Sequence, residues 1–133
     1  MLHENSHRRQ YLYKMKEIFI VEDDQDIREL IGFLLESHDF KVTSFPTAED
    51  FQIAILTSFP DLILLDIMLP DGNGIQICKE LRENDNTIGI PVVLMSAHAD
   101  AKLLQDHCAN DFLPKPFDID DLISRVNRHL KAG

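Results

Sequence analysis

The stretch DLILLDIMLPDGNG, residues 61–74, places an aspartate directly after an apolar run and follows it with a proline and two glycines. The run over 61–65 is typical of a strand that is buried on both faces of a sheet. Proline and glycine after it predict a turn. Aspartate is itself a common turn residue. Asp66 therefore becomes informative only when the residues that end the other strands are compared with it.

Apolar runs of this kind alternate with helical patterns along the whole chain. The runs over 17–21, 61–65 and 91–95 are apolar throughout, which favours central strands, whereas 41–45 alternates and predicts an edge strand. With right-handed crossovers, the pattern predicts an α/β fold: a doubly wound, five-stranded parallel sheet of order 2-1-3-4-5, the flavodoxin-like arrangement. The predicted strands are 17–21, 41–45, 61–65, 91–95 and 111–114, and the predicted helices are 24–38, 47–58, 74–84, 99–107 and 118–130.

Composition narrows the class of protein. The 133 residues are 44% apolar and 27% charged, the size and composition of one globular domain. Residues 1–16 carry a net charge of +3 within a total of −10, so we interpret them as a flexible basic arm before a domain over 17–133. That acidic domain is poorly suited to direct nucleic acid binding. No apolar run is long enough for a membrane span, and Cys78 and Cys108 lack metal-type spacing, so a cytoplasmic protein with reduced thiols is expected.

Four of the five predicted strands end on a polar side chain that can take part in chemistry. The carboxyl ends of parallel strands share one edge of the sheet, where ligands bind in such folds. Each side chain has a structural explanation when it is taken singly: a helix cap, a turn former, a loop lysine. Together they predict a site. The residues are Glu22, Asp23, Asp24, Asp66, Ser96 and Lys115.

The residue types at this edge indicate phosphoryl chemistry. Three converging carboxylates repel one another unless a cation lies among them, and Mg²⁺ suits carboxylate ligands while leaving positions for phosphate oxygens. The ammonium group of Lys115 and the hydroxyl of Ser96 could neutralise further phosphoryl oxygens. Asp66 would then be the nucleophile that forms an acyl phosphate.

Four motifs, in order, resemble the receiver (CheY-like) domain of bacterial two-component response regulators: IFIVEDD (18–24), LILLDIMLPDGNG (62–74), PVVLMSA (91–97) and FLPKPF (112–117). The resemblance covers residues 17–131. It implies that Asp66 is the phospho-acceptor and that Mg²⁺, or Mn²⁺, is held by Glu22, Asp23, Asp66 and the backbone carbonyl of Met68. It further implies that Ser96 is the switch hydroxyl, Phe112 the switch aromatic and Lys115 the phosphate-pairing lysine. Asp24 is expected to be a helix cap or a group that supports the metal ligands without touching the ion. Lys115–Pro116 is expected to be a cis peptide, and Gly72 and Gly74 turn residues of positive φ.

The resemblance also implies the biology. A histidine kinase or phosphotransfer protein would phosphorylate Asp66, and a downstream output domain or protein would read the change. The domain would catalyse its own phosphorylation and slow autodephosphorylation, with Met68 and His98 tuning the lifetime of the phosphoryl group. Ser96 and Lys115 are closer in sequence than is usual, by roughly one helical turn. The helix over 99–107 should therefore be short. In the family this helix belongs to the output face on which a phosphorylation-dependent dimer forms, so its shortening counts against that dimer.

Three other functions share parts of this pattern. A phosphatase that uses an aspartyl phosphate usually has a second aspartate two residues after the nucleophile, where this chain has Met68. A pseudo-receiver that docks without phosphorylation normally lacks one residue of the set, and none is missing. Nucleotide binding would need a glycine-rich loop after the first strand, and the sequence has EDD there.

Overall fold

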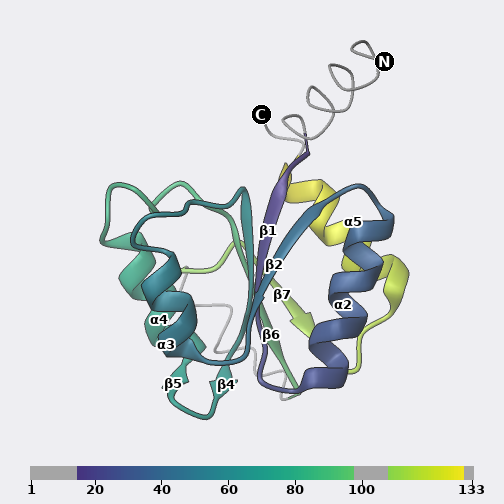
Figure 1. Ribbon diagram of the computed structural model, residues 1–133, viewed down its shortest axis with the longest axis horizontal. Coiled ribbons are helices and arrows are strands. Elements are labelled where there is room, and N and C mark those ends of the chain that lie inside the picture. The colour runs from purple at the N-terminus through teal and green to yellow at the C-terminus, as the bar shows by residue number, and fades with distance from the viewer. Residues whose placement is uncertain (1–14, 98–107, 131–133) are drawn as a thin grey trace, which may run out of the picture.

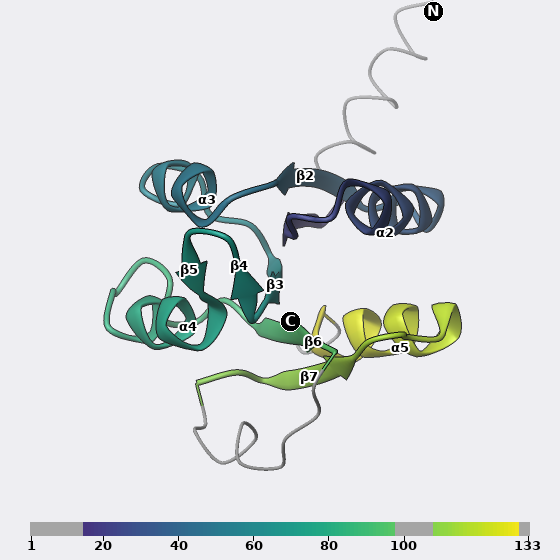
Figure 2. The same ribbon diagram turned by 90° about the horizontal axis from the view of Figure 1, so that it is seen from below.

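The computed structural model describes residues 15–97 and 108–130. It contains a five-stranded parallel sheet of order β2-β1-β3-β6-β7. Helices α2 and α5 cover one face of the sheet, and α3 and α4 cover the other (Figure 1 and Figure 2). The strands are β1 Glu17–Val21, β2 Lys41–Phe45, β3 Leu62–Asp66, β6 Val92–Ser96 and β7 Asp111–Pro114, and the helices are α2 Gln25–Ser37, α3 Ala48–Ala54, α4 Gly74–Arg82 and α5 Ile119–Leu130. The predicted fold and strand order are confirmed, whereas the shortened helix predicted over 99–107 lies outside the described residues.

The central strands bury both faces, which explains their unbroken apolar runs. In β1, Phe19 and Val21 pack in a cluster against α3 and α4, while Ile18 and Ile20 pack in a second cluster against α2 and α5. β3 and β6 divide their side chains between the two clusters in the same way. β2 lies at the edge, as its alternating pattern predicted. The two cores hold the strands in one register and so align their carboxyl ends.

Side-chain caps begin the helices close to the site. Asp24 caps α2 by accepting from Ile27 N at 3.1 Å, so its expected role as a cap is confirmed. Thr47 and Asn73 cap α3 and α4 in the same manner. Each cap satisfies a backbone N–H group that the first helical turn leaves without a partner. The loops that carry the candidate site residues therefore have defined ends.

Two helices end at least two residues earlier than the sequence pattern predicted. α3 stops at Ala54 rather than residue 58, where Leu56 N and Thr57 N bond to carbonyls three residues back and the chain turns toward β3. α4 stops at Arg82 rather than residue 84.

Among the described residues, no helix has the length and apolar character that a bilayer span requires.

Candidate functional site

Asp66 is the last residue of β3, and its side chain is 8% exposed. The chain continues as a short antiparallel hairpin, β4 (Met68–Leu69) and β5 (Gly72–Asn73), which the sequence did not predict. Met68 N donates to Asp66 Oδ1 at 3.1 Å. The hairpin thus turns the chain back while one carboxylate oxygen of Asp66 is held by the backbone.

Gly74 is required by close backbone contact, not by its φ angle. Positive φ was expected at Gly72 and Gly74, but no described glycine has it, so this expectation was wrong. A Cβ atom on Gly74 would lie 2.3 Å from the backbone oxygen of Asp66 and 2.8 Å from Cα of Ile67. The absence of a side chain lets the start of α4 pack directly against the residue after β3, where Gly74 N donates to Ile67 O at 2.8 Å.

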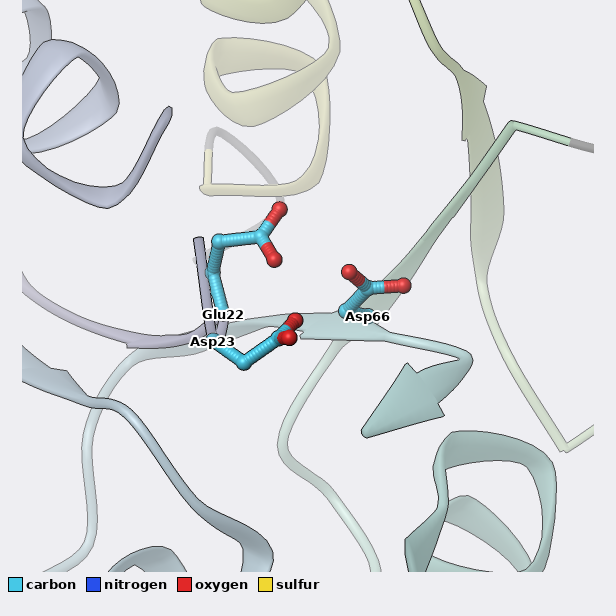
Figure 3. A group of neighbouring side chains, drawn as sticks. All are labelled: Glu22, Asp23 and Asp66. Atoms are coloured by element: carbon cyan, nitrogen blue, oxygen red, sulfur yellow. The ribbon is translucent and has the colours of Figure 1, made fainter. Parts of the chain in front are cut away.

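Three carboxylates from two strands converge at this edge. Val21 pairs with Leu65 in the parallel ladder of β1 and β3, so the residues that follow β1 lie beside Asp66. Glu22, Asp23 and Asp66 offer oxygen atoms that all lie within 4.8 Å of one another. Figure 3 shows their carboxylates turned toward a common space. Glu22 is fully buried and Asp23 is exposed, so the cluster has one side open to solvent.

Among the described residues, Lys115 is the one lysine whose ammonium group contacts these carboxylates. Its Nζ donates to Asp66 Oδ2 at 2.7 Å and also to Glu22 Oε1. Its backbone N–H donates to Ser96 O at 2.8 Å, which ties the loop after β7 to the end of β6. The Lys115–Pro116 peptide is cis, as expected.

The electrostatics of the cluster leave an excess of negative charge. The pKa of Glu22 is raised to about 7, and burial is the largest cause. The neighbouring Asp66 raises this pKa further, whereas Lys115 lowers it. Burial alone would lower the pKa of Lys115, but its hydrogen bonds to Asp66 and Glu22 outweigh burial, and the net shift is upward. Lys115 therefore stays protonated at neutral pH. One ammonium group faces three carboxylates, so a further cation is electrostatically favoured.

The other predicted residues differ in where they lie relative to this edge. Ser96 ends β6 and is buried, opposite Pro114 in the ladder of β6 and β7. Phe112 is buried in the cluster against α3 and α4. The side chain of Met68 is exposed, next to Asp66. His98 lies outside the described residues. The roles assigned to these residues remain predictions.

The donor set fits Mg²⁺. Carboxylate oxygens are hard ligands, and Mg²⁺ typically takes one or two of them while retaining several waters. Glu22, Asp23 and Asp66 would hold the ion, and the Met68 carbonyl follows two positions later. When bound, the ion would supply positive charge for phosphoryl oxygens. The open side at Asp23 gives it a route to the site.

Sequence reasoning missed two residues that hold the site loops. Arg28 Nη1 donates to the backbone oxygens of Glu22 and Asp23. Asp71 accepts hydrogen bonds from Ala48 N and Glu49 N. These two bonds are the main reason that the pKa of Asp71 is lowered. A cation near the amino end of a helix is unfavourable because of the helix dipole, so the position of Arg28 in the sequence could have indicated a special role. Asp71 lies 23 residues from the helix it binds and gave no local signal.

Comparison with known sequences indicates a single family. A family model described as the response regulator receiver domain matches residues 18–127. The response regulator ArlR of Staphylococcus saprophyticus is 36% identical over 120 residues, which cover 88% of this chain and 53% of that protein. The chain thus spans about half the length of the curated relatives it matches.

Solved structures give the same result. A two-component response regulator from Clostridium difficile is 26% identical, with a TM-score of 0.80 over 89% of this chain and 98% of that one. The signal receiver domain of a signal transduction histidine kinase from Syntrophus aciditrophicus is 28% identical, with a TM-score of 0.80 over 87% and 90%. Together with the family match, these likenesses lead to one identification: the chain belongs to the response regulator receiver domain family.

Proposed function

We propose that this domain is a phosphorylation-dependent switch in which Asp66 accepts a phosphoryl group in a Mg²⁺-dependent reaction. The observation that carries the proposal is the contact of Lys115 with Asp66 at 2.7 Å inside a cluster of three carboxylates. These residues come from three separate segments of the chain, at the ends of β1, β3 and β7. A purely structural lysine would need one acidic partner, whereas Lys115 contacts both Asp66 and Glu22 in a cluster that also contains Asp23.

The donor is a phosphohistidine on a histidine kinase or phosphotransfer protein. A carboxylate oxygen of Asp66 attacks phosphorus, the P–O bond of an acyl phosphate forms, and the P–N bond to imidazole breaks as the electron pair leaves with the ring. Lys115 pairs with a phosphoryl oxygen, and Ser96 donates its hydroxyl to another. A cation held by Glu22, Asp23 and Asp66 would supply positive charge that offsets the charge developing on the phosphoryl group. Hydrolysis of the acyl phosphate later resets the domain.

The output is expected to involve Ser96 and Phe112, which lie on the adjacent strands β6 and β7. The phosphoryl group draws the Ser96 hydroxyl toward Asp66, and Phe112 responds by changing its packing. The surface of β7 and α5 is then biased between two states. A downstream output domain or protein, or a second copy in a phosphorylation-dependent dimer, reads that surface.

Intact-mass measurement with acetyl phosphate or phosphoramidate tests the proposal. We expect one phosphoryl adduct in the presence of Mg²⁺, little without Mg²⁺, and none in Asp66→Asn. Asp61→Asn is the matched control, because Asp61 directly precedes the same strand at its opposite end and accepts from Glu17 N. Full labelling of Asp66→Asn would refute the assignment.

Two other outcomes would favour the alternatives. Steady release of phosphate from a small phosphoester would indicate a phosphatase. Absence of any adduct, with Mg²⁺ and with either donor, would indicate a docking module that is not phosphorylated.

A further inference from the structure

Arg28 lies where helix energetics do not favour a cation. It is the fourth residue of α2, and the amino end of a helix carries partial positive charge that favours carboxylates instead. Asp26 in the same turn follows that rule. Some interaction outside the helix must therefore compensate the placement of Arg28.

The compensating interaction is with the backbone at the end of β1. Side chains on a helix lean toward its amino end, so Arg28 reaches back beyond the cap residue Asp24. Its Nη1 donates to Glu22 O at 2.8 Å and to Asp23 O at 3.2 Å. One guanidinium nitrogen thus binds two consecutive carbonyl groups.

Those two carbonyls belong to the peptide units on either side of Asp23. Because each peptide unit is planar, orienting both of them sets the backbone dihedrals of Asp23 and the direction of its side chain. Within residues 15–97 and 108–130, no group donates a hydrogen bond to the Asp23 carboxylate. Its direction toward Asp66 therefore depends on the backbone that Arg28 holds.

We propose that Arg28 is a positioning residue for the cation site: it fixes the Glu22–Asp23–Asp24 backbone so that the Asp23 carboxylate faces Asp66. It touches neither the cation nor the phosphoryl group, and it adds positive charge behind an acidic loop. The inference rests on the proposed function, since it assigns Arg28 to the Mg²⁺ site of that function.

Mg²⁺ titration of the unphosphorylated domain by calorimetry tests the inference without any phosphodonor. We expect Arg28→Gln to raise the Kd for Mg²⁺ about 10-fold, the lower end of what loss of a ligand-orienting partner costs. Arg28→Lys should recover most of the affinity, because a single nitrogen makes both native bonds. In a phosphorylation assay, saturating Mg²⁺ should restore the labelling rate of Arg28→Gln, since the residue does not act on the phosphoryl group.

Arg82→Gln is the matched control. Arg82 also binds backbone carbonyls, those of Cys108, Ile88 and Ile90, but it does so at the end of α4. It should lower thermal stability and leave the Kd for Mg²⁺ unchanged.

The outcomes separate the two proposals. Unchanged Mg²⁺ affinity in a folded Arg28→Gln, while the wild type binds Mg²⁺ and is labelled, would overturn the role of Arg28 alone. If Arg28→Gln does not fold, the same comparison is made with Arg28→Lys and Arg28→Met, and wild-type affinity in Arg28→Met would overturn it. A wild-type protein that binds no Mg²⁺ would overturn both proposals.

Discussion

Lys115 Nζ lies 2.7 Å from Asp66 Oδ2, although the two residues are 49 positions apart in the chain. The two residues meet because β3 and β7 flank β6 in the sheet and end at the same edge. The lysine side chain is 14% exposed and the aspartate side chain 8%, so the pair is shielded from solvent. A shielded pair of this kind interacts strongly and is costly to break.

Removal of the ammonium group should impair phosphorylation. We expect Lys115→Met to slow labelling by acetyl phosphate about 100-fold, the loss typical when one charge-stabilising donor is removed from a transition state. The initial rate of adduct formation, followed by intact mass at saturating Mg²⁺, measures this. Lys41→Met is the control, because Lys41 is exposed and pairs with Glu17 at the opposite end of the sheet. Equal rates for the two variants would contradict the role of Lys115.

A methyl group at Gly74 should disturb Asp66 through the backbone. The Cβ atom of Gly74→Ala would lie 2.3 Å from Asp66 O, so the chain after β3 must shift. We expect the free energy of unfolding to fall by about 1–3 kcal/mol, as for other overpacked sites, and labelling to fall with it. Gly89→Ala is the matched control, since nothing lies within 4 Å of its Cβ position and its φ is not positive. Denaturant unfolding of both variants measures the difference, and equal stabilities would contradict the contact.

Stability should depend on pH through Asp111. Burial alone would raise the pKa of Asp111, but hydrogen bonds from His129 and Phe112 N and the charge of Arg125 outweigh it and lower the pKa below 3.8. A lowered pKa in the folded state stabilises the fold above the unfolded-state value of 3.8, and this contribution is lost as pH falls below that value. Asp111→Asn should therefore be less stable at pH 7 by about 1–3 kcal/mol and should approach the wild type in acid.

Thermal unfolding between pH 7 and pH 3 measures this dependence. Asp85→Asn, at an exposed loop position, should follow the wild-type curve throughout. A difference between Asp111→Asn and the wild type that stayed constant with pH would show that the carboxylate charge is not involved.

Met68 should lengthen the life of the phosphoryl group. Its side chain is 68% exposed, apolar, and two positions after Asp66, so it can obstruct water but cannot hydrogen-bond it. We expect Met68→Asn to speed hydrolysis of the acyl phosphate severalfold, because an amide can orient the attacking water. Decay of the adduct after removal of the donor measures the half-life. Ile88→Asn, an exposed apolar residue elsewhere, is the control, and an unchanged half-life in Met68→Asn would refute the idea.

Several features of the fold could be predicted because local patterns carry them. β1, β2 and β7 begin and end where the sequence predicted, since the order of apolar and polar residues within each strand is a local pattern. β6 begins one residue later than predicted because Pro91 has no N–H group for the ladder. The early end of α4 could not be predicted from a local pattern. Its last residue, Arg82, donates to the carbonyls of Cys108 and Ile90, which lie in other segments of the chain.

Sequence alone determined which side chains end the strands, and the order of the motifs identified the edge where they meet. Tertiary structure alone decided that Asp23 is open to solvent while Glu22 is buried, and that Gly74 is needed for backbone contact instead of positive φ. It also decided the contacts of Arg28 and Asp71. The physical reason is range: hydrophobic periodicity repeats within a few residues, whereas burial, close approach and hydrogen bonds between loops exist only once the chain is packed.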